Sequence, residues 1–310
     1  MQTERIRKSQ KLENRAIRPT KGDRVLDVFI IVTLVVIGII VTYPIWLVMI
    51  ASVSDPAYIS TGQVWIVPKG LNLDAYRKLF ATPEIWIGYR NSLFYTIVGT
   101  TLQMIVTTTC AFALSRPTLP GRRALSLYFL FIMYFSGGLI PTYFVVRDLG
   151  MINTVWALLL PGIFGPYNLV ICRSYFENSI PEEIYESAQI EGASMFRCFV
   201  QLAVPLAKPT LAVMVLNFAL GHWNSYFNAL LYISNDNIQS LQVFIKRITQ
   251  AAAAQVDLSS ANMDAIIEQV RETQLLKYAV VVVSTLPMIM LYPLIRKYFI
   301  SGMMIGAIKG

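Results

Sequence analysis

The stretch "SIPEEIYESAQIEGASMFRCFVQLAVPLAKP", residues 179–209, is a polar segment between two long apolar ones in a chain of 310 residues. Ser179, followed three residues later by Glu182, matches the capping box that begins many helices. Gly192 supplies the permissive backbone for a sharp turn, and a second short helix is predicted over 194–202. This stretch therefore predicts a helical hairpin.

The first predicted helix of the hairpin carries an acidic polar face. Ile184, Tyr185 and Ala188 share one side at helical spacing, whereas Glu183 and Glu186 point elsewhere. One interpretation is an amphipathic hairpin that lies flat on a membrane, but membrane-surface helices favour Lys and Arg on the polar face. Anionic headgroups repel an acidic helix, so docking into the cleft of a protein partner is the favoured interpretation.

The composition indicates an integral membrane protein. Hydrophobic residues make up 55% of the chain, charged residues make up 14%, and the mean hydropathy is +0.54. A helix needs about 20 apolar residues to cross the hydrocarbon core of a bilayer. Several segments are long enough, so an all-α protein with six transmembrane helices is predicted. The expected spans are residues 28–52, 91–115, 124–146, 154–176, 208–232 and 276–298.

The fourth of these spans contains Pro161, Gly162, Gly165 and Pro166, which interrupt a helix. Such breaks are tolerated in a membrane where neighbouring helices or a hydrated cavity satisfy the freed backbone groups. We expect a kinked helix that faces the interior of the bundle, and a bend without a role is the alternative. In the second span, Gln103 and several threonines could either bond neighbouring helices or line a hydrated cavity.

The distribution of Lys and Arg predicts the orientation. Seventeen of the 26 basic residues, eight of them in the N-terminal tail, fall on one side of the predicted spans. The positive-inside rule makes this side cytoplasmic and places both termini there. The chain then divides into a cytoplasmic tail 1–27, a core 28–298 and a cytoplasmic tail 299–310, with extracytoplasmic loops at 53–90 and 233–275. The first apolar run is too long for a cleaved signal peptide, so we expect it to stay as a span.

Several kinds of chemistry lack the residues that they need in this sequence. The pattern G-x-x-x-x-G-K-[ST] does not occur, so the chain is not expected to hydrolyse ATP or to bind a cofactor itself. His222 is the only histidine, and Cys110, Cys172 and Cys198 lack C-x-x-C spacing. Neither a metal site nor a disulfide framework is therefore predicted. No basic stripe with interleaved aromatic residues suggests a nucleic acid partner.

Two other function classes remain as alternatives to a transport subunit. A membrane-embedded enzyme could draw its acid and base groups from the cluster of Glu182, Glu183, Glu186 and Glu191. These acids lie on a solvated hairpin without a histidine or metal partner, which argues against chemistry. A proton- or sodium-driven carrier buries ionisable groups at mid-membrane, and the predicted spans contain essentially none. An external energy source is therefore favoured, and no catalytic residue is predicted.

The most specific pattern in the chain is "YESAQIEGASMFRCFVQLAVPLAKP", residues 185–209. It resembles the EAA loop of binding-protein-dependent ABC importer permeases, E-A-A-x-x-x-G followed further on by aliphatic, x, aliphatic, Pro. Ser187 replaces the usual alanine, and Glu191 replaces the usual aspartate. The segments "SGGLIPTYFVVRDLGMINTVWALLLPG", "GHWNSYFNALLYIS" and "GMMIGAIKG" resemble the carbohydrate-uptake branch of that family, so the likeness covers nearly the whole chain. Within the branch the chain is similar to the maltose-permease second-subunit type, especially to lipoprotein-dependent permeases for complex saccharides.

The resemblance implies a type I ABC importer fold in the cytoplasmic (inner) membrane of a bacterium. It also implies that the hairpin 179–207 sits in a cleft of a cytoplasmic ATPase and couples ATP hydrolysis to rearrangement of the spans. The implied partners are a homologous second permease subunit, two copies of an ABC ATPase that hold ATP and Mg, an extracytoplasmic sugar-binding lipoprotein, an oligosaccharide and membrane lipid. By their place in the motif, the expected ATPase-coupling residues are Glu182, Glu183, Tyr185, Glu186, Ser187, Ala188, Glu191, Gly192, Ala193, Arg197 and Pro205.

Three further segments have less specific expected roles. Trp223, Asn224, Tyr226 and Asn228 combine aromatic faces with amide groups, a pairing that suits sugars in the substrate path, although an interfacial aromatic belt explains the two aromatic residues as well. In the loop 233–275 we expect a helix capped by Asn262 and a tip at 250–260, which either helps a binding protein release sugar or forms a strut. The tail 306–310 either reaches between the ATPase subunits or frays.

Overall fold

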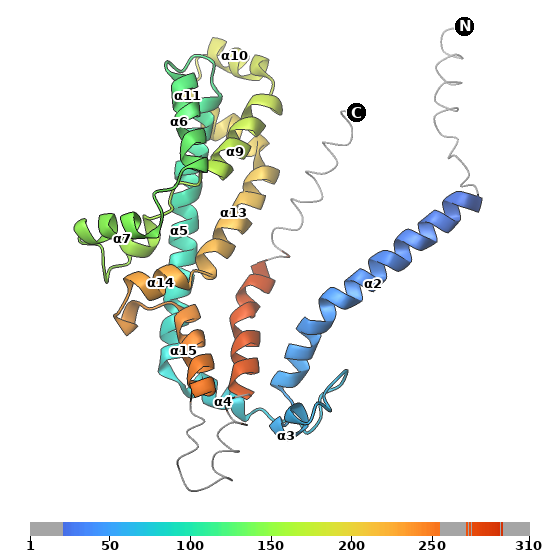
Figure 1. The fold of residues 1–310 in the computed structure, drawn as a ribbon. Helices are drawn as coiled ribbons and strands as arrows, with labels where there is room; N and C mark the ends of the chain where they lie inside the picture. Colours follow the sequence, from blue (N-terminus) through green and yellow to red (C-terminus); the bar gives the residue numbers. More distant parts are fainter. Residues whose placement is uncertain (1–20, 255–270, 272, 274, 292, 294–310) are drawn as a thin grey trace.

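The structure of the protein, a computed structural model, describes residues 21–254, 271, 273, 275–291 and 293 (Figure 1). Every regular element within these residues is a helix, and extended backbone pairs there only in an isolated antiparallel bridge between Ser54 and Leu71. The predicted all-α class is therefore confirmed for the described part of the chain. The expectations for the tail 1–20, most of the loop tip 250–260, the helix capped by Asn262 and the tail 306–310 lie outside the described residues.

The first helix, α2 (Lys21–Ser52), is an apolar arm that stands apart from the other helices (Figure 1). It is long and apolar enough to cross a membrane, as predicted for the first span, and no residue of its most apolar window is buried within the chain. Pro44 lies inside α2 without ending it. The described residues therefore leave the apolar surface of this arm open to lipid tails or to another protein.

Helix α5 (Pro83–Ser115) is the centre of the fold and confirms the second predicted span, although it begins earlier, with Pro83 in its first turn. It packs against α9 (Pro166–Asn178), α13 (Lys208–Trp223) and α15 (Leu241–Ala254). Glycines permit this close packing. A Cβ atom on Gly99 would lie 2.5 Å from the His222 ring, and one on Gly88 would lie 2.9 Å from the Cα of Leu241.

The third and fifth predicted spans are not single straight helices, which corrects the sequence prediction. The segment 124–146 is divided between α6 (Arg122–Tyr134) and α7 (Leu139–Asp148), which meet at 112°. The break contains Gly138 at φ +83°, a conformation that a continuing helix does not allow. The segment 208–232 is divided between α13 and α14 (Phe227–Tyr232).

The fourth span is broken where its prolines and glycines predicted a kink, between α8 (Trp156–Leu159) and α9. The sixth is a shorter apolar helix, Leu275–Leu291, over its described residues. By length and composition, two described helices can cross a membrane, or up to four if each strongly bent pair is one span. The helix lengths of the described residues therefore do not establish the predicted count of six.

Short elements lie at two opposite ends of the helix bundle, whereas α7 and α14 lie at its side (Figure 1). One end, called the hairpin end below, carries α10 (Glu182–Ile190), α11 (Met195–Cys198) and the turns that follow α11. The other, called the loop end, carries α3 (Pro56–Ser60), α4 (Asp74–Ala81) and α15. The predicted hairpin and the predicted outer loops thus lie at opposite ends of the bundle.

Candidate functional site

The first helix of the hairpin, α10, begins differently from the sequence prediction. Pro181 is its N-cap residue, and no side chain caps the helix. Ser179 instead ends α9, where its backbone N–H donates to the carbonyl of Tyr175, so the predicted capping box is wrong. Because α9 runs to Asn178, Ser179 lies too early in the chain to cap α10. The carboxylate of Glu182 is therefore free to bind elsewhere.

The turn between the two hairpin helices forms where the sequence predicts it. Helix α10 ends at Glu191, and Gly192 takes the left-handed backbone conformation at φ +83°. The N–H groups of Gly192 and Ala193 donate to the carbonyls of Gln189 and Ala188, each at 2.9 Å. The left-handed conformation itself selects glycine at this position, because a side chain there would be strained.

The second hairpin helix is longer and less regular than predicted. Helix α11 is capped by Ser194, whose hydroxyl accepts a hydrogen bond from the N–H of Arg197 at 3.3 Å. It continues through a π-helical turn, Phe199–Ala203, into the short helix α12 (Val204–Leu206). Pro205, one of the expected coupling residues, lies in the first turn of α12, where a missing N–H is tolerated.

An ion pair between a buried arginine and a partly exposed glutamate joins the hairpin to the end of α5. Arg116, the C-cap residue of α5, is 3% exposed and donates to the carboxylate of Glu182 at 2.9 Å. Its guanidinium also lies 3.9 Å from the ring centre of Tyr185, which is fully buried, and 5.1 Å from that of Phe112. Burial raises the pKa of the Tyr185 hydroxyl, and Arg116 opposes that rise. These contacts therefore connect α10 to the end of the central helix.

Sequence reasoning did not assign this role to Arg116. In the sequence, Arg116 was only one of the basic residues whose distribution predicts the orientation. Its position directly after a long apolar segment was a usable signal, because an arginine at the end of a span can pair with an acid on the next polar segment. Nothing in the sequence identified Glu182 as that acid rather than Glu183 or Glu186.

The hairpin also exposes acids together with large apolar side chains, and these exposed residues are called its outer face below. Glu183, Glu186 and Glu191 are exposed, as is Ser187, whose hydroxyl bonds the carbonyl of Glu183 within α10. Ile190 is 88% exposed and Phe196 is 74% exposed. Exposed apolar side chains and exposed carboxylates on one hairpin have the composition of a protein contact, acidic and apolar at once.

The remaining predicted coupling residues support this surface from within. Ala188 and Ala193 are half-buried and pack against the apolar core that contains Tyr185 and Cys198. Arg197 is exposed, and its guanidinium donates to the side-chain oxygen of Gln201 at 2.9 Å. The predicted coupling residues thus divide into three groups: those that contact Arg116 and anchor the hairpin, those of the turn at Gly192, and those of the exposed outer face. Ile190 and Phe196, which the sequence prediction omitted, belong to the outer face.

The four residues predicted for the substrate path do not share one environment. Trp223 is 2% exposed, and its indole N–H donates to the carbonyl of Ser284 at 3.0 Å, so it packs α13 against the helix Leu275–Leu291. Tyr226 is half-buried, with the Lys246 ammonium 6.0 Å from its ring centre. Asn224 and Asn228 are exposed where α13 gives way to α14.

A chain of polar contacts links α13, α5 and the break in the fourth span. The ring of His222 packs over Gly99, and its Nε2 lies 3.1 Å from the side-chain oxygen of Gln103. The amide nitrogen of Gln103 donates to the carbonyl of Gly162 at 2.6 Å. Gln103 therefore satisfies backbone that the break in the fourth span leaves free, as expected for a broken helix that faces the bundle.

The threonines of α5 behave differently from Gln103. The hydroxyls of Thr101, Thr108 and Thr109 bond carbonyls four residues earlier in the same helix. Those of Thr96, Thr100 and Thr107 are buried without a hydrogen-bond partner among the described residues. Only the glutamine of this polar series bonds a neighbouring segment.

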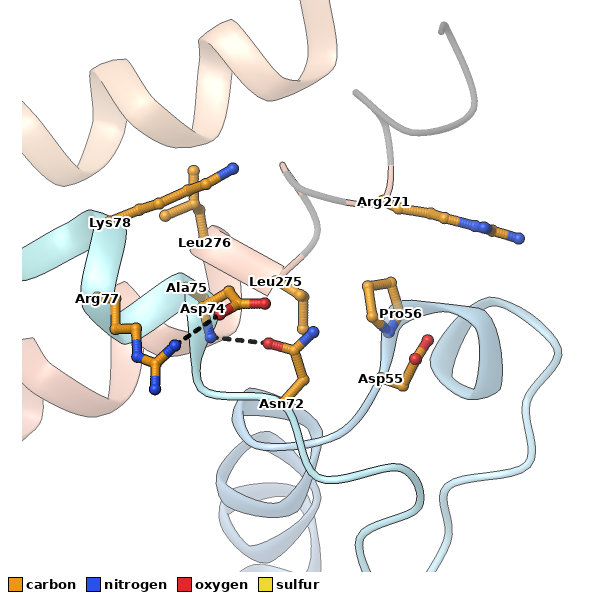
Figure 2. Close-up of a pocket in the computed structure, with 10 residues that line it drawn as sticks. All are labelled: Asp55, Pro56, Asn72, Asp74, Ala75, Arg77, Lys78, Arg271, Leu275 and Leu276. Atoms are coloured by element: carbon orange, nitrogen blue, oxygen red, sulfur yellow. Dashed lines mark hydrogen bonds and ion pairs between the residues drawn. The ribbon is translucent and has the colours of Figure 1, made fainter. Parts of the chain in front are cut away.

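A polar pocket of about 410 Å³ opens at the loop end, between α3, α4 and the start of the helix Leu275–Leu291 (Figure 2). Asp74 pairs with Arg77 at 3.5 Å, and its backbone N–H donates to the side chain of Asn72 at 2.7 Å. Asp55 and Arg271 lie on the other side of the pocket (Figure 2). Charges of both signs line it, which suits a polar partner more than an apolar ligand. Among the described residues, no group of three or more His, Cys, Asp or Glu side chains could hold a metal ion.

Comparison with known proteins places this geometry in context. Residues 85–305 match the family described as the binding-protein-dependent transport system inner membrane component. Protein LplC of Bacillus subtilis (strain 168) is 39% identical over 291 residues, which are 94% of this chain and 97% of that protein. The polygalacturonan/rhamnogalacturonan transport system permease protein YtcP of the same organism is 34% identical over 93% of this chain and 99% of its own length.

The fold is likewise similar to that of a solved transporter. One chain in the crystal structure of a bacterial ABC transporter involved in the import of the acidic polysaccharide alginate superposes with a TM-score of 0.79. The two chains are 29% identical, and the match covers 90% of this chain and 98% of that one.

Proposed function

We infer the function from family membership, because this chain belongs to the family of binding-protein-dependent transport system inner membrane components. It is a permease subunit of an ABC importer in the inner membrane, as the sequence predicted, and ATP hydrolysis is carried by separate subunits. Family membership leaves open the cargo, the partners, the orientation and the residues that couple to the ATPase.

We propose that the outer face of the hairpin docks into an acceptor cleft on a cytoplasmic ABC ATPase. The observation that carries this proposal is the exposure of Ile190 and Phe196 on the same hairpin as the exposed acids Glu183, Glu186 and Glu191. Apolar anchors surrounded by charge are typical of protein interfaces, whereas an acidic surface is repelled by anionic lipid. Two ATPase copies, holding ATP and Mg between them, would serve this chain and its partner permease.

The ion pair of Arg116 and Glu182 links docking of the hairpin to movement of the helix bundle. A hairpin held only by exposed contacts could move without moving the bundle, but the Arg116–Glu182 pair resists separation because the buried Arg116 guanidinium would be left without a counter-charge. Displacement of α10 by the ATPase is therefore passed to the end of α5. Since α5 packs against α9 and α13, it carries the displacement into the bundle.

We propose that six segments cross the membrane, with the broken helices facing the interior, and that both termini are cytoplasmic. The excess of Lys and Arg on the side of the hairpin supports this orientation. A homologous second permease subunit completes the path, and the unburied arm α2 offers it a large apolar surface. The loop end, with its mixed-charge pocket, then faces an extracytoplasmic sugar-binding lipoprotein.

The proposed cargo is an oligosaccharide, and fragments of acidic polysaccharides are the first candidates. The similar protein YtcP is a permease of a polygalacturonan/rhamnogalacturonan transport system, and the similar solved transporter is involved in the import of the acidic polysaccharide alginate. Exposed Asn224 and Asn228, with Tyr226 between them, are the residues of this chain best placed to contact sugar hydroxyls. Trp223 contributes by packing, since it is buried.

Co-purification tests the docking proposal. The tagged chain is extracted from membranes of its host in mild detergent, and the bound proteins are identified by mass spectrometry for wild type, Phe196→Ser and Glu186→Lys. Glu84→Lys is the matched control, because Glu84 is an exposed acid at the loop end. We expect an ATPase and a second permease with wild type and the control, and selective loss of the ATPase in both hairpin variants. Retention of the ATPase by both hairpin variants would overturn the docking proposal.

A further inference from the structure

A cluster of arginines lies between α6 and α9 at the hairpin end, outside the coupling surface. A cavity of about 450 Å³ is lined there by Arg122, Arg123 and Arg173, and the two helices are in contact (Figure 1). This volume is within the usual range for a small-ligand site. Such a concentration of guanidinium groups needs a physical explanation, because like charges repel.

The described part of the chain neutralises these arginines only in part. Arg122 and Arg173 both bind Oε1 of Glu177, and Arg173 also donates to the hydroxyl of Ser126 at 2.5 Å. The Nε of Arg122 donates to the carbonyl of Leu114 at 2.8 Å. Arg123 makes no ion pair or hydrogen bond with the described residues. One carboxylate therefore faces three guanidinium groups, two of which it holds in fixed positions.

The start of α6 adds to the positive potential of the cavity. Gly121 occupies the N-cap position without a side-chain cap, and the first turn contains Arg122 and Arg123 with no acid. The N-terminus of a helix carries partial positive charge, which favours acids and disfavours cations. The sequence thus places two cations where the backbone already attracts an anion.

The remaining lining of the cavity is apolar. Leu127 and Leu130 of α6 and Val170 of α9 lie beside the arginines, and all three are substantially exposed. The exposed surface of α6 continues away from the arginines through Tyr128 and Phe131. A small soluble anion would leave these side chains uncovered, whereas a lipid would place its headgroup on the arginines and its acyl chains along α6.

We propose that this cavity is a binding site for an anionic phospholipid, with the headgroup phosphate on Arg122, Arg123 and Arg173. Guanidinium groups bind phosphate through paired, charge-assisted hydrogen bonds, and basic pockets between membrane helices are suited to anionic headgroups. The bound lipid lies in the leaflet on the side of the hairpin. It bridges α6 and α9, and α9 leads directly into α10. The site is separate from the ATPase-docking face and from the sugar path.

Native mass spectrometry of the full-length chain, purified with its associated subunits, tests the site. The probes are dioleoyl-phosphatidylglycerol and dioleoyl-phosphatidylcholine, which share acyl chains and differ in net charge. We expect tighter binding of phosphatidylglycerol to wild type, and about fivefold weaker binding to Arg123→Gln, a ratio that corresponds to about 1 kcal/mol per basic side chain near an anionic surface. Arg123→Lys should keep most of the affinity, because it keeps the charge.

Arg147→Gln is the matched control, since it removes one exposed arginine elsewhere on the chain. It should leave phosphatidylglycerol binding unchanged, and millimolar inorganic phosphate at constant ionic strength should not displace the lipid. Equal binding of the two lipids to wild type would overturn the proposal. So would equal losses in Arg123→Gln and Arg147→Gln, which would indicate only general attraction to positive charge. Displacement of the lipid by inorganic phosphate would identify a soluble anion as the ligand and would also overturn it.

Discussion

The helices α2 and α5 have almost the same length, 32 and 33 residues, but occupy opposite environments. None of the most apolar window of α2 is buried within the chain, whereas 39% of that of α5 is buried. The sequences explain the difference. Helix α2 carries almost uninterrupted aliphatic residues, while α5 contains Asn91, Gln103, two close-packing glycines and a series of threonines. In a membrane, polar and small residues mark the surfaces that face protein, because lipid covers aliphatic surface equally well.

Large-to-small substitutions should separate the two helices most strongly. Leu114 of α5 is 3% exposed, so Leu114→Ala leaves a cavity and should lower the free energy of unfolding by about 2 kcal/mol or more. Leu34→Ala in α2 should change it little, because Leu34 contacts no core. Unfolding of the purified chain in mixed micelles measures both. Equal effects would mean that α2 is packed within the chain after all.

Glycine substitutions sharpen the same comparison. A side chain at Gly99 must displace the His222 ring, whereas nothing lies within 4 Å of a Cβ atom at Gly38 of α2. Gly99→Leu should therefore cost about 1–3 kcal/mol through overpacking, and Gly38→Leu should be neutral in the isolated chain. The thermal unfolding midpoint in detergent reports the difference. A tolerated Gly99→Leu would contradict the close contact between α5 and α13.

The link between α5 and the hairpin predicts a somewhat smaller effect. Glu182→Gln leaves the Arg116 guanidinium buried without a counter-charge, and we expect a loss of about 1–2 kcal/mol, reduced from the fully buried case because Glu182 is partly exposed. Asp148→Asn, in an exposed pair with Arg147, should cost less than about 0.5 kcal/mol. Chemical denaturation of both variants beside wild type provides the measurement. Equal small losses of stability in the two variants would contradict the anchoring role of the Arg116–Glu182 pair.

Tyr185 gives the smallest predicted effect, and it appears only at high pH. Burial raises the pKa of its hydroxyl in the folded chain, so the unfolded chain loses this proton first as the pH rises. The contribution to stability is thus complete below the unfolded pKa of about 10 and is lost as the pH rises above it. Tyr185→Phe should therefore reduce the loss of stability above this pH relative to wild type, as measured by chemical denaturation over a range of pH. Identical pH profiles for wild type and Tyr185→Phe would contradict the burial of this hydroxyl.

The sequence predicted well those features that depend on local chemistry. The ends of α2 and α5, the turn at Gly192 and the break near Gly162 each follow from residues that act within a few positions of themselves, although both helices begin earlier than predicted. The capping box failed because Ser179 had a competing local role at the end of α9. The bend between α6 and α7 was missed because Gly137 and Gly138 lie within an apolar run that otherwise resembles a span.

The features that the sequence did not predict depend on long-range contacts. The pairing of Arg116 with Glu182 joins residues that are distant in the chain, and three acids were equally good candidates for it. The burial of Trp223 depends on the helix Leu275–Leu291, which periodicity alone could not place beside α13. Ile190 and Phe196 were overlooked because isolated apolar residues near a turn are ordinary until their exposure is known.

Photo-crosslinking from the hairpin tests the central claim most directly. A benzoylphenylalanine is placed at Phe196, on the exposed face of α11, or at Phe131, an exposed phenylalanine of α6, and intact membranes are irradiated. The account predicts that Phe196→benzoylphenylalanine forms a crosslink to an ABC ATPase and that Phe131→benzoylphenylalanine does not. Crosslinking of position 196 to lipid alone, in membranes where the ATPase is present, would contradict the coupling role of the hairpin.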